Sequence, residues 1–184
     1  FRARLTLITP PEYRVVATGE LVSRGRWDEM DDVAGIEMTG NAVTTFQSRV
    51  PVKYMSFIVG RFDRTRTRPG PVPVEMFVSS EILEAQGPLP DRAADILDYF
   101  GRSFGPYPYE KLGIVLRLWP TYGGHSPASF VVLNRIPWRG ESGFPAPVDT
   151  PVDLSQWEDY FLAHEIAHQW WGQGVSFDSY KDQW

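Results

Sequence analysis

The feature that most constrains this chain is a helix signal near its carboxyl end that carries two histidines four residues apart. Ser155 and Glu158 have the spacing of a capping box, so the pattern predicts a helix that begins just after Ser155. Gly172 is expected to end it. On such a helix His164 and His168 project from one face, one turn apart. The rest of the fold must therefore support this helix and leave that face accessible.

The residue types in this segment indicate metal chemistry. Two imidazoles at this spacing can bind one tetrahedral zinc ion, so we predict His164 and His168 as metal ligands. Glu165 lies roughly 100° further around the helix, where a carboxylate can reach a zinc-activated water without binding the ion. Glu165 is the predicted general base for hydrolysis of a peptide or ester. The alternative is a chance match, but two of the three histidines lie in this motif.

Composition and charge remove several functional classes. The chain contains no cysteine, which excludes a disulfide framework and thiolate metal ligands. A net charge of −5 provides no basic field, so no nucleic-acid partner is expected. No apolar run approaches the length of a membrane-spanning helix, while the compartment and the oligomeric state stay open. Phe1 opens almost directly into a strand-like segment and Trp184 ends without a closing turn, so we expect truncation at both ends.

The order of the predicted elements indicates an α+β fold, with strands first and mixed helices and strands afterwards. A helix is expected from Asp91, which follows Pro90 and is placed to cap it, to the Gly105-Pro106 pair. The last helix is the zinc-site helix. The predicted strands, separated by Pro, Gly and Asn turn signals, are Leu5–Thr9, Tyr13–Thr18, Val43–Arg49, Tyr54–Asp63, Val72–Val78, Gly113–Trp119 and Phe130–Leu133.

Several segments together resemble one family. Residues 164–172, reading HEIAHQWWG, are similar to the active-site helix of the alanyl aminopeptidase family of zinc metallopeptidases, which are gluzincins of the HExxH type. Residues 181–184 resemble the stretch that leads to the family's third ligand. Residues 99–100 and 104–112 resemble the entry to its catalytic domain, and residues 57–62 the last strand region of its N-terminal β domain. The resemblance is most specific from residue 99 onward.

This resemblance implies a division into two parts. Residues 1–70 would be the end of a saddle-like or sandwich-like antiparallel β domain, and residues 71–184 the first part of a thermolysin-like catalytic domain. The family's third zinc ligand is a Glu separated from the second His by eighteen residues, whereas sixteen residues follow His168 here (184 − 168 = 16). That ligand and the family's transition-state tyrosine would lie beyond this chain. The parent is therefore expected to be a zinc-dependent peptidase, and the chain alone to be inactive.

One loop departs from the family pattern. The family's substrate loop reads Gly-Ala-Met-Glu-Asn, and the matching stretch here, predicted to bind substrate, is Gly123-Gly124-His125-Ser126. Ser126 replaces the Glu that would hold a free amino terminus, and a neutral hydroxyl cannot make that charge-assisted bond. Whether the parent is an exopeptidase or an endopeptidase therefore stays open. The two glycines would allow a peptide to approach the backbone closely, and His125 is either a substrate contact or an ordinary loop histidine.

Three further alternatives stay open at this point. A non-catalytic peptide-binding or scaffolding member of the same family is favoured by Ser126, whereas Glu165 between two metal ligands favours hydrolysis. The tryptophans at 170, 171 and 184 form either a binding surface or, as we expect, core packing beside the zinc-site helix. Asp182 is either an outer-shell acceptor for a zinc-bound imidazole or a surface residue.

Overall fold

The structure is a computed structural model that describes residues 1–27, 39–82, 89–119, 124–135, 158–175, 178–179 and 181. Within them it has two helices, α1 (Leu89–Phe104) and α2 (Glu158–Ala167). The strands are β1 (Arg4–Thr9), β2 (Arg14–Ala17), β3 (Glu20–Arg26), β4 (Ala42–Gln47), β5 (Phe57–Gly60), β6 (Phe62–Arg68), β7 (Val74–Ser79), β8 (Leu112–Leu118), β9 (Gly124–His125) and β10 (Phe130–Arg135). The fold is mixed and dominated by sheets. Neither described helix is long and apolar enough to span a membrane.

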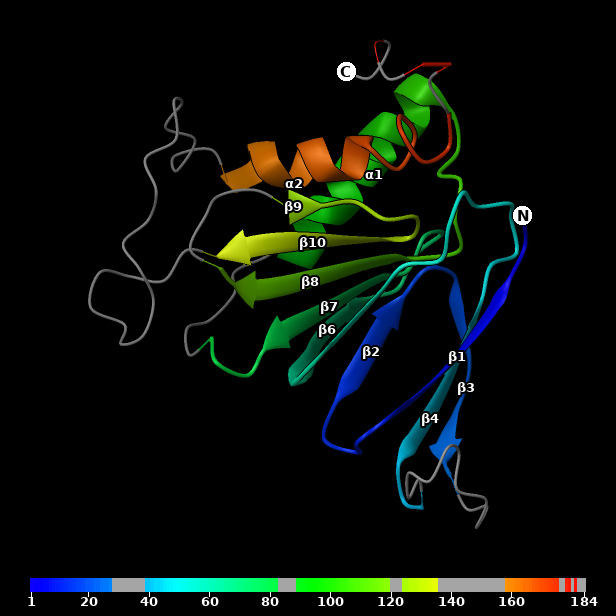
Figure 1. The fold of residues 1–184 in the computed structure, drawn as a ribbon. Helices are drawn as coiled ribbons and strands as arrows, with labels where there is room; N and C mark the ends of the chain where they lie inside the picture. The colour runs from blue at the N-terminus through cyan, green and yellow to red at the C-terminus, as the bar shows by residue number, and fades with distance from the viewer. Residues whose placement is uncertain are drawn as a thin grey trace.

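A five-stranded mixed sheet forms the centre of the molecule, with the strand order β6-β7-β8-β10-β9. Strands β7, β8 and β10 run parallel, and the edge strands β6 and β9 run antiparallel to their neighbours. Helix α1 connects β7 to β8, because two adjacent parallel strands need a crossover connection. Both helices lie on the same side of this sheet, while β2 and the three-stranded sheet lie on the other (Figure 1).

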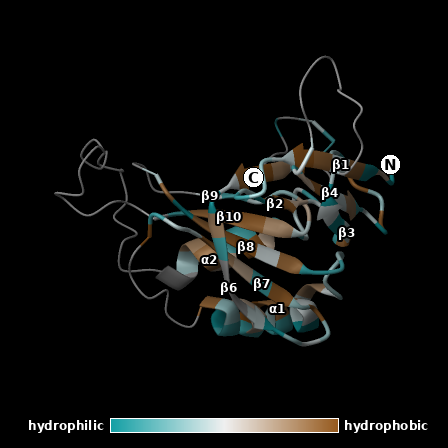
Figure 2. Ribbon diagram, turned by 90° about the horizontal axis from the view of Figure 1, so that it is seen from below, coloured by the Kyte–Doolittle hydropathy of each residue, from teal (hydrophilic) through white to brown (hydrophobic). Residues whose placement is uncertain are grey.

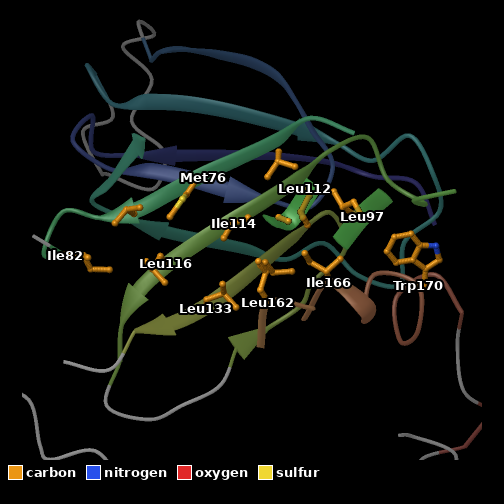
Figure 3. Close-up of a cluster of buried hydrophobic side chains, with 14 residues drawn as sticks. Met76, Ile82, Leu97, Leu112, Ile114, Leu116, Leu133, Leu162, Ile166 and Trp170 are labelled. Carbon is orange, nitrogen blue, oxygen red and sulfur yellow. The ribbon is translucent and has the colours of Figure 1, made fainter. Parts of the chain in front are cut away.

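The central strands are apolar because both of their faces are covered. Strand β8 has five consecutive buried residues, the pattern expected of a strand packed on two sides. Figure 2 shows brown, hydrophobic residues along β8 and β10, whereas α1 also carries teal, hydrophilic ones. The face toward the helices is a cluster in which side chains of β7, β8 and β10 meet both helices (Figure 3). Its members include Met76, Leu97, Ile114, Leu133, Leu162, Ile166 and Trp170.

Helix α1 confirms the predicted helix but begins two residues earlier than expected. It starts at Leu89, so Asp91 lies in the first turn rather than at the cap, where a carboxylate still favours the amino end of a helix. Ala93 and Leu97 face the sheet and are buried, as the periodicity predicts. Gly105 has a φ of +97° directly after the helix and ends it.

The amino-terminal region packs on the opposite face of the central sheet. Strands β1, β4 and β3 form a three-stranded antiparallel sheet, and β2 pairs with β5. Strand β2 lies between layers: Val16 joins a cluster with β7, β8 and β10, whereas Val15 and Ala17 pack with Phe46 of β4. This alternation is what the period of two in a strand requires when both faces are covered.

Three features differ from the strand prediction, the smallest of which is β9, formed by residues predicted as part of a loop. Strand β3 was not predicted, because its residues are mostly exposed and its two large apolar residues, Leu21 and Val22, are adjacent rather than alternating. The predicted strand Tyr54–Asp63 is divided into β5 and the start of β6, and β6 joins the central sheet by pairing with β7. A β-sheet pairing therefore crosses residue 70. The division into residues 1–70 and 71–184 and the thermolysin-like character of the second part stay predictions.

Candidate metal centre

The two histidines of the motif converge at the end of α2, which ends at Ala167 and not at the predicted Gly172, so His168 is the first residue after the helix. His164 and His168 are one helical turn apart, and their Nε2 atoms are separated by 3.2 Å. Two imidazole nitrogens bound at about 2.0–2.1 Å to a tetrahedral zinc ion stand roughly 3.3–3.4 Å apart. The rings are nearly perpendicular, at 83°, so neither blocks the other. The pair therefore fits two corners of a zinc coordination tetrahedron.

Neighbouring groups orient both imidazoles. The Nδ1 atom of His168 lies 3.3 Å from the carbonyl oxygen of Trp171, and an Nδ1–H that donates there leaves the Nε2 lone pair for a metal. The ring of His164 stacks on Tyr160 with an interplanar angle of 18°. Partial burial, followed by the proximity of His168, lowers the pKa of His164. The neutral, metal-binding form of His164 is thereby favoured.

Glu165 points into the fold rather than into solvent. Its side chain is buried, and burial raises the pKa of its carboxyl to about 7. A carboxyl with that pKa is suited to accept and release protons near neutral pH. Sequence reasoning predicted its role from spacing alone, whereas its desolvated environment follows from the packing of α2 on β9 and β10.

The backbone of β9 passes directly beside Glu165. A Cβ atom on Gly124 would lie 2.8 Å from Glu165 Oε1 and 2.5 Å from the carbonyl oxygen of Val132. Only glycine therefore fits this position. Of the predicted substrate loop, the structure brings Gly124 against the candidate base. Gly123 lies outside the described residues.

His125 lies on the other side of β9. Gly124 pairs with Leu133, which belongs to the helix-side cluster, and His125 pairs with Val132, which belongs to the cluster on the opposite face. Because side chains alternate along a strand, the exposed imidazole of His125 points away from Glu165. A contact between this side chain and substrate stays a prediction.

Ser126 is held by α2 and by the turn that follows it. Its hydroxyl donates to the carbonyl oxygen of Glu165 at 2.6 Å and accepts from Gln169 Nε2 at 2.5 Å. Its own carbonyl oxygen accepts from Gln173 Nε2 at 3.0 Å. The residue at the predicted amine-anchoring position is thus hydrogen-bonded within the protein.

Gln169 is the residue that sequence reasoning missed. Its side chain is fully buried and connects α2 to the turn between β9 and β10. The Oε1 atom accepts from the backbone N–H of Ser129 at 2.8 Å and from the hydroxyl of Tyr107 at 3.2 Å. The Nε2 group donates to the Ser126 hydroxyl and to the carbonyls of Pro127 and Phe130. A polar residue directly after the second histidine was the only available signal.

Ser129 extends this network to the amino-terminal region. It has a φ of +70°, a left-handed conformation that is uncommon for a residue other than glycine. Its hydroxyl accepts from the buried backbone N–H of Gly19 at 2.8 Å. The β2–β3 turn, the β9–β10 turn and α2 are therefore joined through two side chains, Ser129 and Gln169.

Within the described residues, no third His, Asp or Glu joins the histidine pair to complete a metal-binding group. The third ligand stays a prediction, and Asp182 lies outside the described residues. Trp170 is buried in the main cluster and donates to Gly105 O at 3.0 Å, so the core interpretation is confirmed for it. Trp171 packs against the same cluster, and Trp184 lies outside the described residues.

Comparison with known proteins gives a consistent group of relatives. No family model matches the chain. It is 24% identical over 184 residues to glutamyl aminopeptidase of Sus scrofa and 28% identical over 152 residues to that of Bos taurus. It spans 18% and 15% of the lengths of these proteins, respectively.

The solved structures show the same fold. The M1 zinc metallopeptidase of Deinococcus radiodurans matches with a TM-score of 0.60 at 23% identity, and a mutant of it with a TM-score of 0.61. These matches cover 96% of this chain and 35% of those proteins. Together with the curated relatives, they confirm the resemblance to the M1 aminopeptidase family that the motif residues indicate.

Proposed function

We propose that this chain contributes two zinc ligands and the general base to a zinc-dependent peptidase of the aminopeptidase type. The observation that carries the proposal is the 3.2 Å separation of the two Nε2 atoms beside a buried carboxyl of raised pKa. Relatives named as aminopeptidases and zinc metallopeptidases support it. Because the chain spans only part of those proteins, the activity is proposed for the longer protein that contains it.

Each residue of the site then has a defined role. His164 and His168 would hold the metal with the imidazole nitrogens that face each other, and the carbonyl of Trp171 orients His168. A bound zinc ion would polarise the scissile carbonyl and acidify a water molecule. Glu165 accepts the proton of the attacking water and later delivers it to the leaving amine. The backbone of β9 is at the edge of the sheet, where an extended peptide can be aligned by main-chain hydrogen bonds.

The chain alone is proposed to be inactive. Catalytic zinc sites generally use three protein ligands, and the family resemblance puts the third beyond residue 184. The first measurement is zinc content and affinity of this chain beside a version extended by the next few dozen residues, with His168→Ala in the extended version as a control. We expect stoichiometric zinc only in the extended protein with both histidines. Absence of zinc from the extended protein would remove the proposal.

Ser126 bears on the type of peptide that is cleaved. Its hydroxyl is already engaged by Glu165 O and Gln169, and it carries no charge for an ammonium group. We propose that position 126 does not hold a free amino terminus, so N-blocked peptides should be accepted as well as amino-acid anilides. Strict dependence on a free amino group in the full-length protein would show that another residue supplies the anchor.

A non-catalytic peptide-binding protein is the second candidate, and the engaged Ser126 is the observation that favours it. The two functions differ in a direct assay. The metallated full-length protein should hydrolyse at least one of the two substrate types if it is an enzyme. Binding of peptides without turnover of either type would establish the scaffolding function instead.

A further inference from the structure

A cavity lined by both charged and apolar side chains lies on the side of the central sheet that faces away from the helices. It has a volume of about 90 Å³ and is lined by residues from β2, β3, β4 and β7 and by Lys111, which immediately precedes β8. A liquid water molecule occupies about 30 Å³, so there is room for about three waters or one small polyatomic ion. This cavity is separate from the histidine pair, because α2 lies on the other face of the sheet (Figure 1).

Lys111 is the least accessible charged group of this cavity. It is 8% exposed, and its ammonium donates one long hydrogen bond, 3.3 Å, to the carbonyl oxygen of Ala17. The ammonium lies 3.7 Å from the position that a Cβ of Gly113 would take, so the absence of that side chain gives it room. An ammonium has three donors, and within the described part of the chain Ala17 is its only acceptor. Two donors are therefore left for the cavity.

The other charged groups around the cavity are also mostly cationic. Arg14 of β2 is half-buried, and Arg24 of β3 stands opposite Thr44 of β4 in the strand register. Among the described residues that line the cavity, Glu75 of β7 is the one carboxylate, against the cations of Lys111, Arg14 and Arg24. With this carboxylate ionised, these four described residues carry an excess of two positive charges. Burying an ammonium with so few partners is costly unless an anion or water offsets it.

We propose that this cavity binds a small oxyanion of the carboxylate, bicarbonate or phosphate type between Lys111, Arg14 and Arg24. Arginine and lysine together supply forked and single charge-assisted donors, the combination that carboxylate and phosphate oxygens accept. Arg24 and the neighbouring Leu21 are exposed, so the cavity opens toward solvent at β3. Burial lowers the pKa of Lys111 to about 8, and the nearby carboxylates of Glu75 and Glu110 offset this shift only in part.

The location gives the site a structural consequence. Arg14 and Arg24 belong to the amino-terminal strands, whereas Lys111 and Glu75 belong to the central sheet. A bound anion would therefore connect the two layers across an interface at which Lys111 already makes one contact, to Ala17. Because the ion would bind the folded state and not the unfolded state, it would raise the free energy of unfolding of the chain.

The test is a thermal-unfolding titration of this chain with sodium acetate, bicarbonate and phosphate, each against sodium chloride at equal ionic strength. We expect Tm to rise to saturation with at least one oxyanion beyond any effect of chloride. Arg14→Gln and Arg24→Gln should each raise the half-saturating concentration at least tenfold. Arg102→Gln, which removes the same charge from an exposed pair with Asp98, should leave it unchanged.

The three anions distinguish the possible ligands, because saturation by phosphate alone, or by acetate and bicarbonate alone, assigns the class. In Lys111→Met, the saturable rise of Tm with the oxyanion should disappear. If Lys111→Met does not fold, the two arginine variants still decide the test. Equal Tm curves for all salts, or equal weakening by Arg102→Gln and Arg14→Gln, would overturn the proposal and leave a cavity filled by water. Neither zinc nor peptidase activity enters the measurement.

Discussion

Replacing Gln169 with leucine should destabilise this chain more than almost any other single polar change. The amide is fully buried and has five hydrogen-bond partners, Tyr107, Ser126, the Ser129 N–H, Pro127 O and Phe130 O, with its two N–H groups shared among the last two carbonyls and the Ser126 hydroxyl. Leucine has a similar volume but neither donates nor accepts. Tyr107 keeps its bond to Lys111 O and Ser126 keeps its bond to Glu165 O, so these two groups retain partners.

The size of the effect follows from the groups that lose their partner. The Ser129 N–H is buried and has Gln169 Oε1 as its acceptor, and an orphaned buried polar group costs about 1–3 kcal/mol. The carbonyls of Pro127 and Phe130 lose a donor as well, although Pro127 O still accepts from the Phe130 N–H. The lost bond also helps to hold Ser129 in its left-handed backbone conformation. Together, these effects should lower the free energy of unfolding by about 3–5 kcal/mol.

Urea denaturation followed by circular dichroism measures this loss, with Gln173→Leu as the matched control. Gln173 makes the same kind of amide bonds, to Tyr54 and Ser126 O, but at a more accessible place, so its loss should be about 1 kcal/mol. Equal midpoints for the two variants, or a loss below about 1 kcal/mol for Gln169→Leu, would refute the assignment of Gln169 as the residue that joins α2 to the β9–β10 turn.

The remaining predictions concern Gly124, Glu165 and Lys111. Gly124→Ala should cost about 1–3 kcal/mol of unfolding free energy, because its Cβ would lie 2.5 Å from the carbonyl oxygen of Val132 and 2.8 Å from Glu165 Oε1. Gly101→Ala, in open space on α1, should not destabilise the chain, and urea midpoints give both values. Without zinc, Glu165→Gln should stabilise the chain by about 2–3 kcal/mol at pH 8 but not at pH 4. Because the folded pKa of the carboxyl is raised to about 7, the folded chain keeps a proton that the unfolded chain releases above pH 4.5, and the wild-type free energy of unfolding falls between pH 4.5 and pH 7. Urea curves at pH 4 and pH 8 test this. For Lys111 the folded pKa is lowered to about 8, so above pH 8 the unfolded chain keeps a proton that the folded chain releases. The free energy of unfolding should therefore rise by about 2–3 kcal/mol between pH 8 and 10, measured in an amine buffer, and this rise should be absent in Lys111→Met. The raised pKa values of Tyr107 and Tyr109 oppose the rise only above pH 10.

The sequence predicted those elements whose signal is local. Strands β1, β2, β4, β7, β8 and β10 have apolar and β-branched runs, and α1 has its buried face at helical spacing. Strand β3 lacks such a run because six of its seven residues are exposed, and it is defined by pairing with β4 along six register positions. Strand β6 is rich in arginine and is likewise defined by its partner, β7. A partner some distance away in the chain cannot be read from the composition of one strand.

The same distinction applies to the candidate metal centre. The histidine pair depends on a spacing of four residues, which helical geometry converts into a fixed separation of the two rings. The Gln169–Ser129 bond spans 40 residues and the Ser129–Gly19 bond spans 110, and neither leaves a periodic trace in the sequence. The cavity around Lys111 likewise collects residues from four strands. Sequence patterns therefore identify which residues carry the chemistry of this site, whereas the groups that position them become visible only in the folded chain.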